Sequence, residues 1–166
     1  MTIQASILTQ CRFIETLTGT FIDPNDGTFA VTGLASSQSL NADSTPPVTK
    51  GTQFSIALSS GTGTINLASL TPPDTSLSNI DGTGLKVQSV KFSNPSTNAN
   101  AISVTEGASS GHPLLGPSFL FSLEPGQSLT FANEGVDVGT DIASGDRTWD
   151  LAGTGSQALD VAIVMG

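Results

Sequence analysis

His112 is the one histidine of this 166-residue chain, and histidine is the side chain best suited to act as a general base near neutral pH. A Ser-His-Asp relay could be built around it, because serine and aspartate are plentiful. Its surroundings, Ser109-Ser-Gly-His-Pro113, read as a simple turn, so we expect His112 on a surface loop and no relay. The sequence also contains no complete nucleotide-binding motif. No Gly-Lys-Ser/Thr occurs, and Gly82-Thr-Gly84 lacks the third glycine of a dinucleotide fingerprint.

A second group of chemically capable side chains is a series of carboxylates near glycines: Glu134, Asp137, Asp141, Asp146 and Asp150. Loops of this composition can hold calcium through oxygen ligands. The spacing matches no defined calcium loop, so we interpret these carboxylates as a solvated acidic rim, with calcium as the alternative. The turn Asp23–Gly27 also fails as an EF-hand loop, because a glycine and Leu34 stand where oxygen ligands are needed. We therefore predict no metal and no cofactor.

Cys11 and Trp149 each occur once in the chain. A lone cysteine cannot form an intrachain disulfide, and we interpret Cys11 as a small apolar side chain. Trp149 alternates with Arg147 and Leu151, so we expect it at the edge of the core with Arg147 covering it. The alternative for Trp149 is a stacking platform for a sugar, although the chain has no tyrosine to accompany it.

The composition narrows the class of protein. Charged residues make up only 11% of the chain while glycine occurs 18 times, which favours short strands and many turns over helices. The net charge of −9 repels phosphate backbones and anionic membranes, so we expect neither nucleic acid nor membrane as a partner. Met1 is not followed by the basic and apolar regions of a signal peptide, and we expect synthesis in a cytoplasm.

The elements that must position these residues are best defined in the stretch 116–133, where two alternating apolar runs meet at Pro125-Gly126. Apolar residues at every second position are typical of half-buried strands. Pro125-Gly126 suits the centre of a type II turn, since proline presets its φ and glycine accepts the positive φ that follows. We predict a β-hairpin with Leu123 opposite Leu129, which requires a bulge or a longer loop to set the register.

Eight candidate strands follow residue 47 without obvious helices. They are Gln53–Leu58, Thr64–Leu70, Leu85–Phe92, Ala101–Glu106, the two runs within 116–133, Arg147–Leu151 and Ala158–Met165. The first two are predicted to form a hairpin, and a change of phase near Gln88-Ser89 predicts a bulge. The last run is apolar on both faces beyond Asp160, as expected of a central strand or of one covered by another subunit.

Residues 1–47 have a different character, because their apolar residues fit neither the helical nor the strand period and the segment ends in Pro46-Pro47. We predict an N-terminal arm with one or two strands, including a run over Thr28–Leu34, and a Pro-rich linker. Residues 48–166 are predicted to form the folded domain. Eight strands is the number in a jelly roll. The predicted fold is therefore all-β, an antiparallel β-sandwich that is jelly-roll-like, with an N-terminal arm.

A resemblance to known proteins rests on three stretches of the chain, Asn98–Ala108, Phe121–Leu129 and Gly153–Val164. These stretches resemble the small β-sandwich structural proteins of tailed-bacteriophage virions, especially capsid decoration or cement proteins. The resemblance extends over about residues 80–166. It implies a trimeric or otherwise symmetric knob on a capsid, held by an arm or by a sheet edge, and it implies no catalytic residues.

We therefore expect a virion structural protein rather than an enzyme, synthesised in the host cytoplasm and carried in the virion. Its expected partners are the major capsid protein or another virion protein, and further copies of itself in a homotrimer. The alternatives are a carbohydrate-binding module and a tail or fibre component. The candidate contact residues are Ile7, Leu8, Phe13 and Ile14 in the arm, and Trp149.

Overall fold

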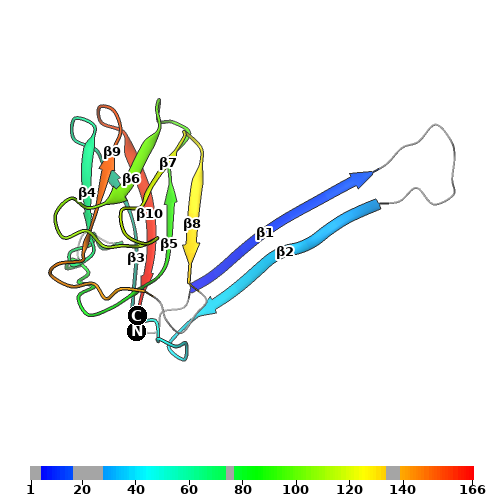
Figure 1. Ribbon diagram of the computed structural model, residues 1–166, viewed down its shortest axis with the longest axis horizontal. Helices are drawn as coiled ribbons and strands as arrows, with labels where there is room; N and C mark the ends of the chain where they lie inside the picture. Colours follow the sequence, from blue (N-terminus) through cyan, green and yellow to red (C-terminus); the bar gives the residue numbers. More distant parts are fainter. Residues whose placement is uncertain (1–4, 17–27, 74–76, 134–138) are drawn as a thin grey trace, which may run out of the picture.

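A computed structural model describes residues 5–16, 28–73, 77–133 and 139–166 of the chain. Within these residues the protein is all-β and contains no helix. Two four-stranded antiparallel sheets stack to form a β-sandwich, which confirms the predicted all-β, antiparallel sandwich (Figure 1).

The eight predicted strands of the sandwich are all present. The first sheet has the order β3-β10-β5-β8, with β3 over Lys50–Ala57, β10 over Ala158–Met165, β5 over Val87–Ser93 and β8 over Ser128–Ala132. The second has the order β4-β9-β6-β7, with β4 over Thr62–Asn66, β9 over Thr148–Ala152, β6 over Ile102–Glu106 and β7 over Leu120–Leu123.

The pairing of these strands is nested. The first strand pairs with the last, β3 with β10, and the next pairs are β4 with β9, β5 with β8 and β6 with β7. Two further pairings, β10 with β5 and β6 with β9, join the nested pairs into sheets. Strands that are distant in the sequence are thereby hydrogen-bonded to one another.

The two predicted hairpins are wrong. β7 and β8 belong to different sheets, as do β3 and β4, so each connection crosses from one layer to the other. The turn at Pro125-Gly126 is nevertheless as predicted: Gly126 has φ of 84°, and the Gln127 N–H donates to the Glu124 carbonyl at 2.9 Å. Leu123 and Leu129 both pack in the core, but they reach it from opposite sheets. Alternation shows which side chains point inward, not which strand lies alongside.

The core between the sheets contains three aromatic rings in contact. Phe92 of β5 and Trp149 of β9 are both completely buried, with ring centroids 5.5 Å apart in an edge-to-face arrangement. Phe92 also contacts Phe121 of β7, at 5.3 Å. These contacts join the two layers at the centre of the sandwich.

The predicted bulge and the predicted position of the last strand are both confirmed. Ser89 pairs with Val164 while Val87 pairs with Met165, which leaves Gln88 as an extra residue in β5. The bulge allows Val87 and Val90 to enter the same core, although simple alternation would place them on opposite faces. β10 lies between β3 and β5, at the centre of its sheet.

Two further strands precede the sandwich. β1 over Ala5–Thr16 and β2 over Thr28–Leu40 pair with each other in a separate two-stranded antiparallel sheet, and the predicted run Thr28–Leu34 lies within β2. In Figure 1 they run away from the sandwich. The predicted turn at Asp23–Gly27 lies outside the described residues. A division of the chain at residue 47 stays a prediction.

The segment after β2 is attached to the sandwich. The Thr49 N–H donates to the Met165 carbonyl at 3.0 Å, and the Gln88 amide nitrogen donates to the Pro46 carbonyl at 2.6 Å. Val48, in the same segment, is buried. The β5 bulge thus presents a side chain that holds the incoming chain.

Candidate functional site

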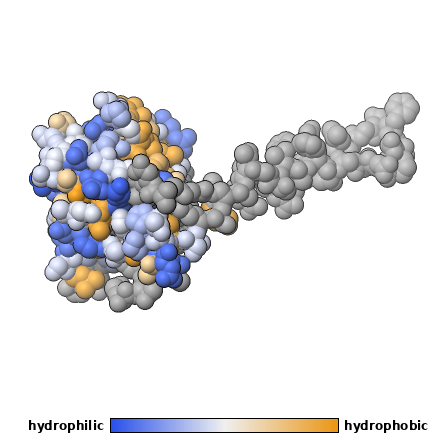
Figure 2. Space-filling view, turned by 60° about the horizontal axis from the view of Figure 1, so that its bottom comes forward, coloured by the Kyte–Doolittle hydropathy of each residue, from blue (hydrophilic) through white to orange (hydrophobic). Residues whose placement is uncertain are grey.

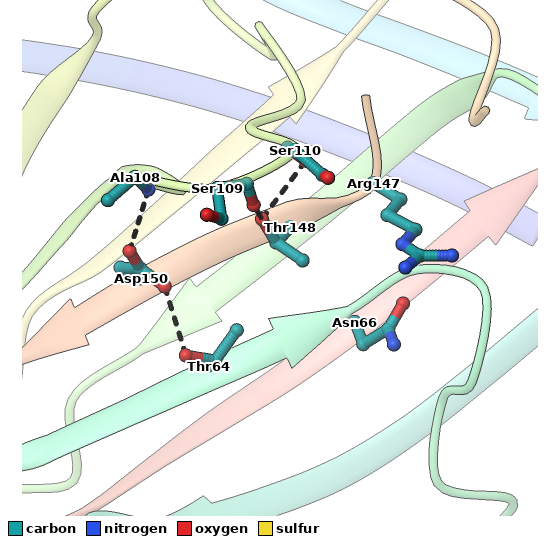
Figure 3. Close-up of a pocket in the computed structure, with 8 residues that line it drawn as sticks. All are labelled: Thr64, Asn66, Ala108, Ser109, Ser110, Arg147, Thr148 and Asp150. Carbon is teal, nitrogen blue, oxygen red and sulfur yellow. Dashed lines mark hydrogen bonds between the residues drawn. The ribbon is translucent and has the colours of Figure 1, made fainter. Parts of the chain in front are cut away.

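An open pocket of about 360 Å³ lies on the outer face of the β4-β9-β6-β7 sheet, where β4 and β9 meet the loop after β6 (Figure 3). Its position follows from alternation. Ile65 and Trp149 point into the core, so their neighbours on each strand point outward. The lining is entirely polar except for one alanine: Thr64, Asn66, Ala108, Ser109, Ser110, Arg147, Thr148 and Asp150.

Asp150 holds one end of the pocket in place. One carboxylate oxygen accepts a hydrogen bond from the Thr64 hydroxyl at 2.9 Å, and the other accepts one from the Ala108 N–H at 2.8 Å. Asp150 therefore joins β4, β9 and the loop after β6. A carboxylate offers about four acceptor positions, so two remain for a ligand.

The loop after β6 is anchored by Ser110. Its carbonyl accepts hydrogen bonds from the Arg147 N–H at 2.7 Å, from the Thr148 N–H at 2.9 Å and from the Thr148 hydroxyl at 3.0 Å. The Thr148 hydroxyl also lies 2.6 Å from the Ser109 carbonyl. These contacts fix the backbone of the loop against the start of β9 and leave the two serine hydroxyls at the pocket.

Arg147 supplies the positive charge of the pocket. Within the part of the chain that the structure describes, its guanidinium makes no ion pair and no hydrogen bond, and the one ion pair joins Lys86 to Asp141 at 3.7 Å. Asn66 lies at the same end of the pocket (Figure 3). Its side-chain oxygen accepts from the Ala68 N–H at 3.0 Å, which leaves the amide NH₂ as a donor. One end of the pocket is thus rich in donors, while Asp150 provides acceptors at the other.

His112 lies behind this loop and is buried, with 3% of its surface exposed, so its predicted place on a surface loop is wrong. The chain folds back on β9 here: the Trp149 indole N–H donates to the His112 carbonyl at 3.0 Å, and the two rings meet edge to face at 5.9 Å. The imidazole packs as an aromatic ring on Trp149. Polar loop composition predicts exposure and does not reveal such a contact.

The environment of His112 disfavours the charged form of its ring. Burial lowers the pKa of His112, and the Thr140 carbonyl, Asp146 and Glu106 oppose this effect only in part. Nε2 lies 3.1 Å from the Thr140 oxygen, while Nδ1 is buried and has no hydrogen-bond partner among the described residues. Neither ring nitrogen contacts a serine hydroxyl, so His112 forms no relay with a described serine.

The same loop contains a motif that the sequence predictions overlooked. Gly107-Ala-Ser-Ser-Gly111 has the Gly-x-Ser-x-Gly spacing of a nucleophile elbow. An elbow requires a strand-to-helix turn, whereas this loop follows β6 and leads to β7. Its glycines serve close packing instead, because a Cβ on Gly107 would lie 2.1 Å from the Thr148 hydroxyl oxygen. The motif is therefore a signal for a tight loop beside the pocket.

Trp149 lies in the core, as predicted, but not at its edge, because none of its surface is exposed. Arg147 does not need to cover it and lines the pocket instead. As a buried residue Trp149 cannot present its ring to a sugar, and it offers no contact surface to a partner. Both roles considered for an exposed tryptophan are therefore lost.

The candidate contact residues of the arm lie in β1. Leu8 is 70% exposed. The backbones of Ile7, Phe13 and Ile14 also belong to β1, whereas their side chains lie outside the described residues. On the sandwich, Leu77, Leu115 and Leu120 are exposed large apolar residues. Figure 2 shows a mixed surface with hydrophobic residues gathered along one margin of the sandwich.

The acidic region does not form a metal site in the part of the chain that the structure describes. Glu134 and Asp137 lie outside it, and no group of three or more His, Cys, Asp or Glu side chains could hold a metal ion within it. Asp141 is instead paired with Lys86, and Asp150 is hydrogen-bonded in the pocket. The rim interpretation therefore applies to Asp141 and not to Asp150.

A comparison with protein-family models and with curated proteins finds no match to this chain. Among the described residues, no helix is long and apolar enough to cross a membrane.

Proposed function

We propose that this chain is a virion structural protein that stabilises a tailed-phage head as a capsid decoration protein. The observation that supports the proposal most is that β1 and β2 form a sheet of their own, which among the described residues pairs with neither sheet of the sandwich. An isolated two-stranded ribbon is only marginally stable in water. A second protein surface that covers this ribbon would stabilise it, and Leu8 is already exposed there.

The dimensions of the ribbon suit a gripping arm. β1 has 12 residues and β2 has 13. At about 3.4 Å per residue, such strands extend about 40 Å. A ribbon of this length can lie across a neighbouring subunit while the sandwich remains outside. The major capsid protein or another virion protein is the partner we propose, with a homotrimer of this chain as the assembled form.

The sandwich is consistent with the resemblance to virion proteins. The nested pairing of β3 with β10, β4 with β9, β5 with β8 and β6 with β7 leads us to infer a jelly roll. Such a roll buries its inner faces without a disulfide, as a chain with one cysteine requires. A tail or fibre location for the same protein remains the alternative.

The test uses the full chain and two matched variants. Leu8→Asp introduces a charge on β1, and Leu120→Asp introduces the same charge on β7, where the leucine has the same exposed fraction of 70%. Sedimentation equilibrium measures self-association, and co-sedimentation with undecorated phage heads measures binding. We expect trimers and a fixed copy number per head, with Leu8→Asp alone weakening head binding.

Two results would contradict the proposal. One is a monomer that does not bind heads at any concentration. The other is equal weakening by both variants, which would show that the ribbon has no special part in the contact.

A further inference from the structure

The pocket beside Arg147 has the features of a small binding site. Its volume of about 360 Å³ is at the lower end of the range for ligand pockets, about 300–1,000 Å³. The Arg147 guanidinium, which has no partner among the described residues, and the amide NH₂ of Asn66 provide donors at one end. Asp150 provides acceptors at the other, and the Ser109 and Ser110 hydroxyls provide both kinds of group.

We propose that this pocket binds a carboxylated sugar residue, a uronic acid, with its carboxylate on Arg147 and its hydroxyls toward Asp150 and the serines. A guanidinium recognises a planar carboxylate through paired hydrogen bonds, which is the strongest contact the pocket can offer. Sugar hydroxyls donate and accept, and they match a lining that contains both kinds of group. The inference goes beyond the virion-structural proposal and does not depend on it.

The negative charge of the chain disfavours anions that carry more than one charge. The chain carries a net charge of −9, so a ligand with several negative charges, such as a phosphorylated compound, is repelled as it approaches. Asp150 adds a further negative charge within the pocket itself. A single carboxylate can pair with Arg147 at one end while its neutral hydroxyls lie near Asp150.

The lining also favours a sugar over an acidic peptide. An aspartate or glutamate side chain could pair with Arg147 in the same way, but it has no hydroxyl to donate to the two acceptor positions that remain on Asp150. The pocket is a depression between two strands and a loop rather than a flat face (Figure 3). Its lining has no aromatic ring for stacking, because Trp149 is buried, so we expect weak binding, on the order of millimolar.

The experiment is a chemical-shift titration of the full chain with sodium D-glucuronate, with D-glucose and sodium acetate as separate probes. Glucuronate is expected to saturate and to shift the backbone amides of residues 108–110 and 147–150. Glucose and acetate are each expected to bind at least about tenfold more weakly, because glucose lacks the carboxylate and acetate lacks the hydroxyls. A tenfold difference corresponds to about 1.4 kcal/mol.

The decisive variant is Arg147→Gln, which should weaken glucuronate binding at least about tenfold. Lys91→Gln is the matched control: it removes the same charge from an exposed position on β5, in the other sheet, beside a smaller depression. Its affinity for glucuronate should equal that of the unmodified chain. Amide spectra of both variants show whether the fold is retained.

Several results would overturn the inference. Acetate that binds as tightly as glucuronate would reduce the site to a carboxylate site without sugar recognition. A triglutamate peptide that binds more tightly than glucuronate would assign the pocket to a protein partner. Unchanged affinity in a folded Arg147→Gln variant, or shifts only at Lys91, would show that glucuronate does not bind in this pocket.

Discussion

Acidification should destabilise the sandwich through His112, and replacing this residue by glutamine should remove the effect. His112 is buried with its Nε2 beside the Thr140 carbonyl and its Nδ1 without a partner among the described residues. A neutral ring with its proton on Nε2 satisfies this geometry. The imidazolium would need a second proton on Nδ1, where the described structure offers no acceptor, and would place a charge in an apolar site against Trp149.

The direction of the pH effect on stability follows from the pKa of His112 in the folded chain and in the unfolded chain. Burial lowers the pKa of His112 in the folded chain, whereas the unfolded chain binds the proton with a pKa of about 6.5. The unfolded state therefore binds more protons than the folded state when the pH falls to about 6.5 and below, and the free energy of unfolding decreases with the pH. If the folded state takes up no proton, the loss between about pH 7.5 and about pH 5.5 is about 1.4 kcal/mol, which is an upper limit because Asp146 and Glu106 favour the charged ring.

The carboxyl group of Asp81 does not interfere with the measurement of the His112 effect. Hydrogen bonds from Thr83 lower the pKa of Asp81 from its ordinary value of 3.8. A carboxyl group whose pKa is lowered contributes stability that is lost only when the pH falls below that ordinary value. The Asp81 effect therefore lies below the range in which His112 acts.

The assay is urea denaturation at a series of pH values between about pH 5.5 and pH 7.5, followed by tryptophan fluorescence. Trp149 is the only tryptophan and is in contact with His112, so its signal reports the sandwich core. The test compares the slope of the free energy of unfolding against pH, not the absolute stability of each variant. Lys91→Gln should keep the slope of the unmodified chain and His112→Gln should be flat. An equal slope in the unmodified chain and in His112→Gln would refute the reasoning.

Three further predictions concern packing, each measured as the free energy of unfolding in urea. Trp149→Phe should cost about 2 kcal/mol, since it leaves a void and removes the indole hydrogen bond. Asn94→Ala should cost about 2 kcal/mol, because the buried amide that donates to the Leu123 carbonyl at 2.8 Å is lost; Asn94→Asp should be no better. Gly107→Ala should cost about 1–3 kcal/mol, because its Cβ would lie 2.1 Å from the Thr148 hydroxyl oxygen, and a cost near zero would contradict that contact.

The strands could be predicted because each is a local pattern. Alternation over Phe121–Leu123 and over Leu159–Met165 is visible within a few residues, and both runs are strands in the structure. The change of phase at Gln88 is equally local, and it correctly indicated the bulge. A pattern of this kind reports on one strand and its two faces, and these were the features that could be read from the chain alone.

The pairing of strands could not be predicted because it depends on distant residues. Two adjacent alternating runs joined by a short turn satisfy the pattern of a hairpin, and they equally satisfy that of two strands on opposite layers. The positive φ at Gly126 suits either arrangement. What distinguishes them is the partner of each strand, and β7 finds its partner in β6 rather than in β8.

The pocket escaped prediction for the same reason, because its lining groups come from segments that are distant in the sequence. Thr64 and Asp150 are 86 residues apart in the sequence and meet because β4 pairs with β9. Behind them, the loop after β6 is held by the Ser110 carbonyl and by the bond from Trp149 to the His112 carbonyl. Each of these contacts ends on β9 or on Arg147 directly before it, so the fold itself positions the lining groups for the ligand that we propose. Preorganised groups lose little entropy on binding, which is the condition under which a small polar pocket can be selective.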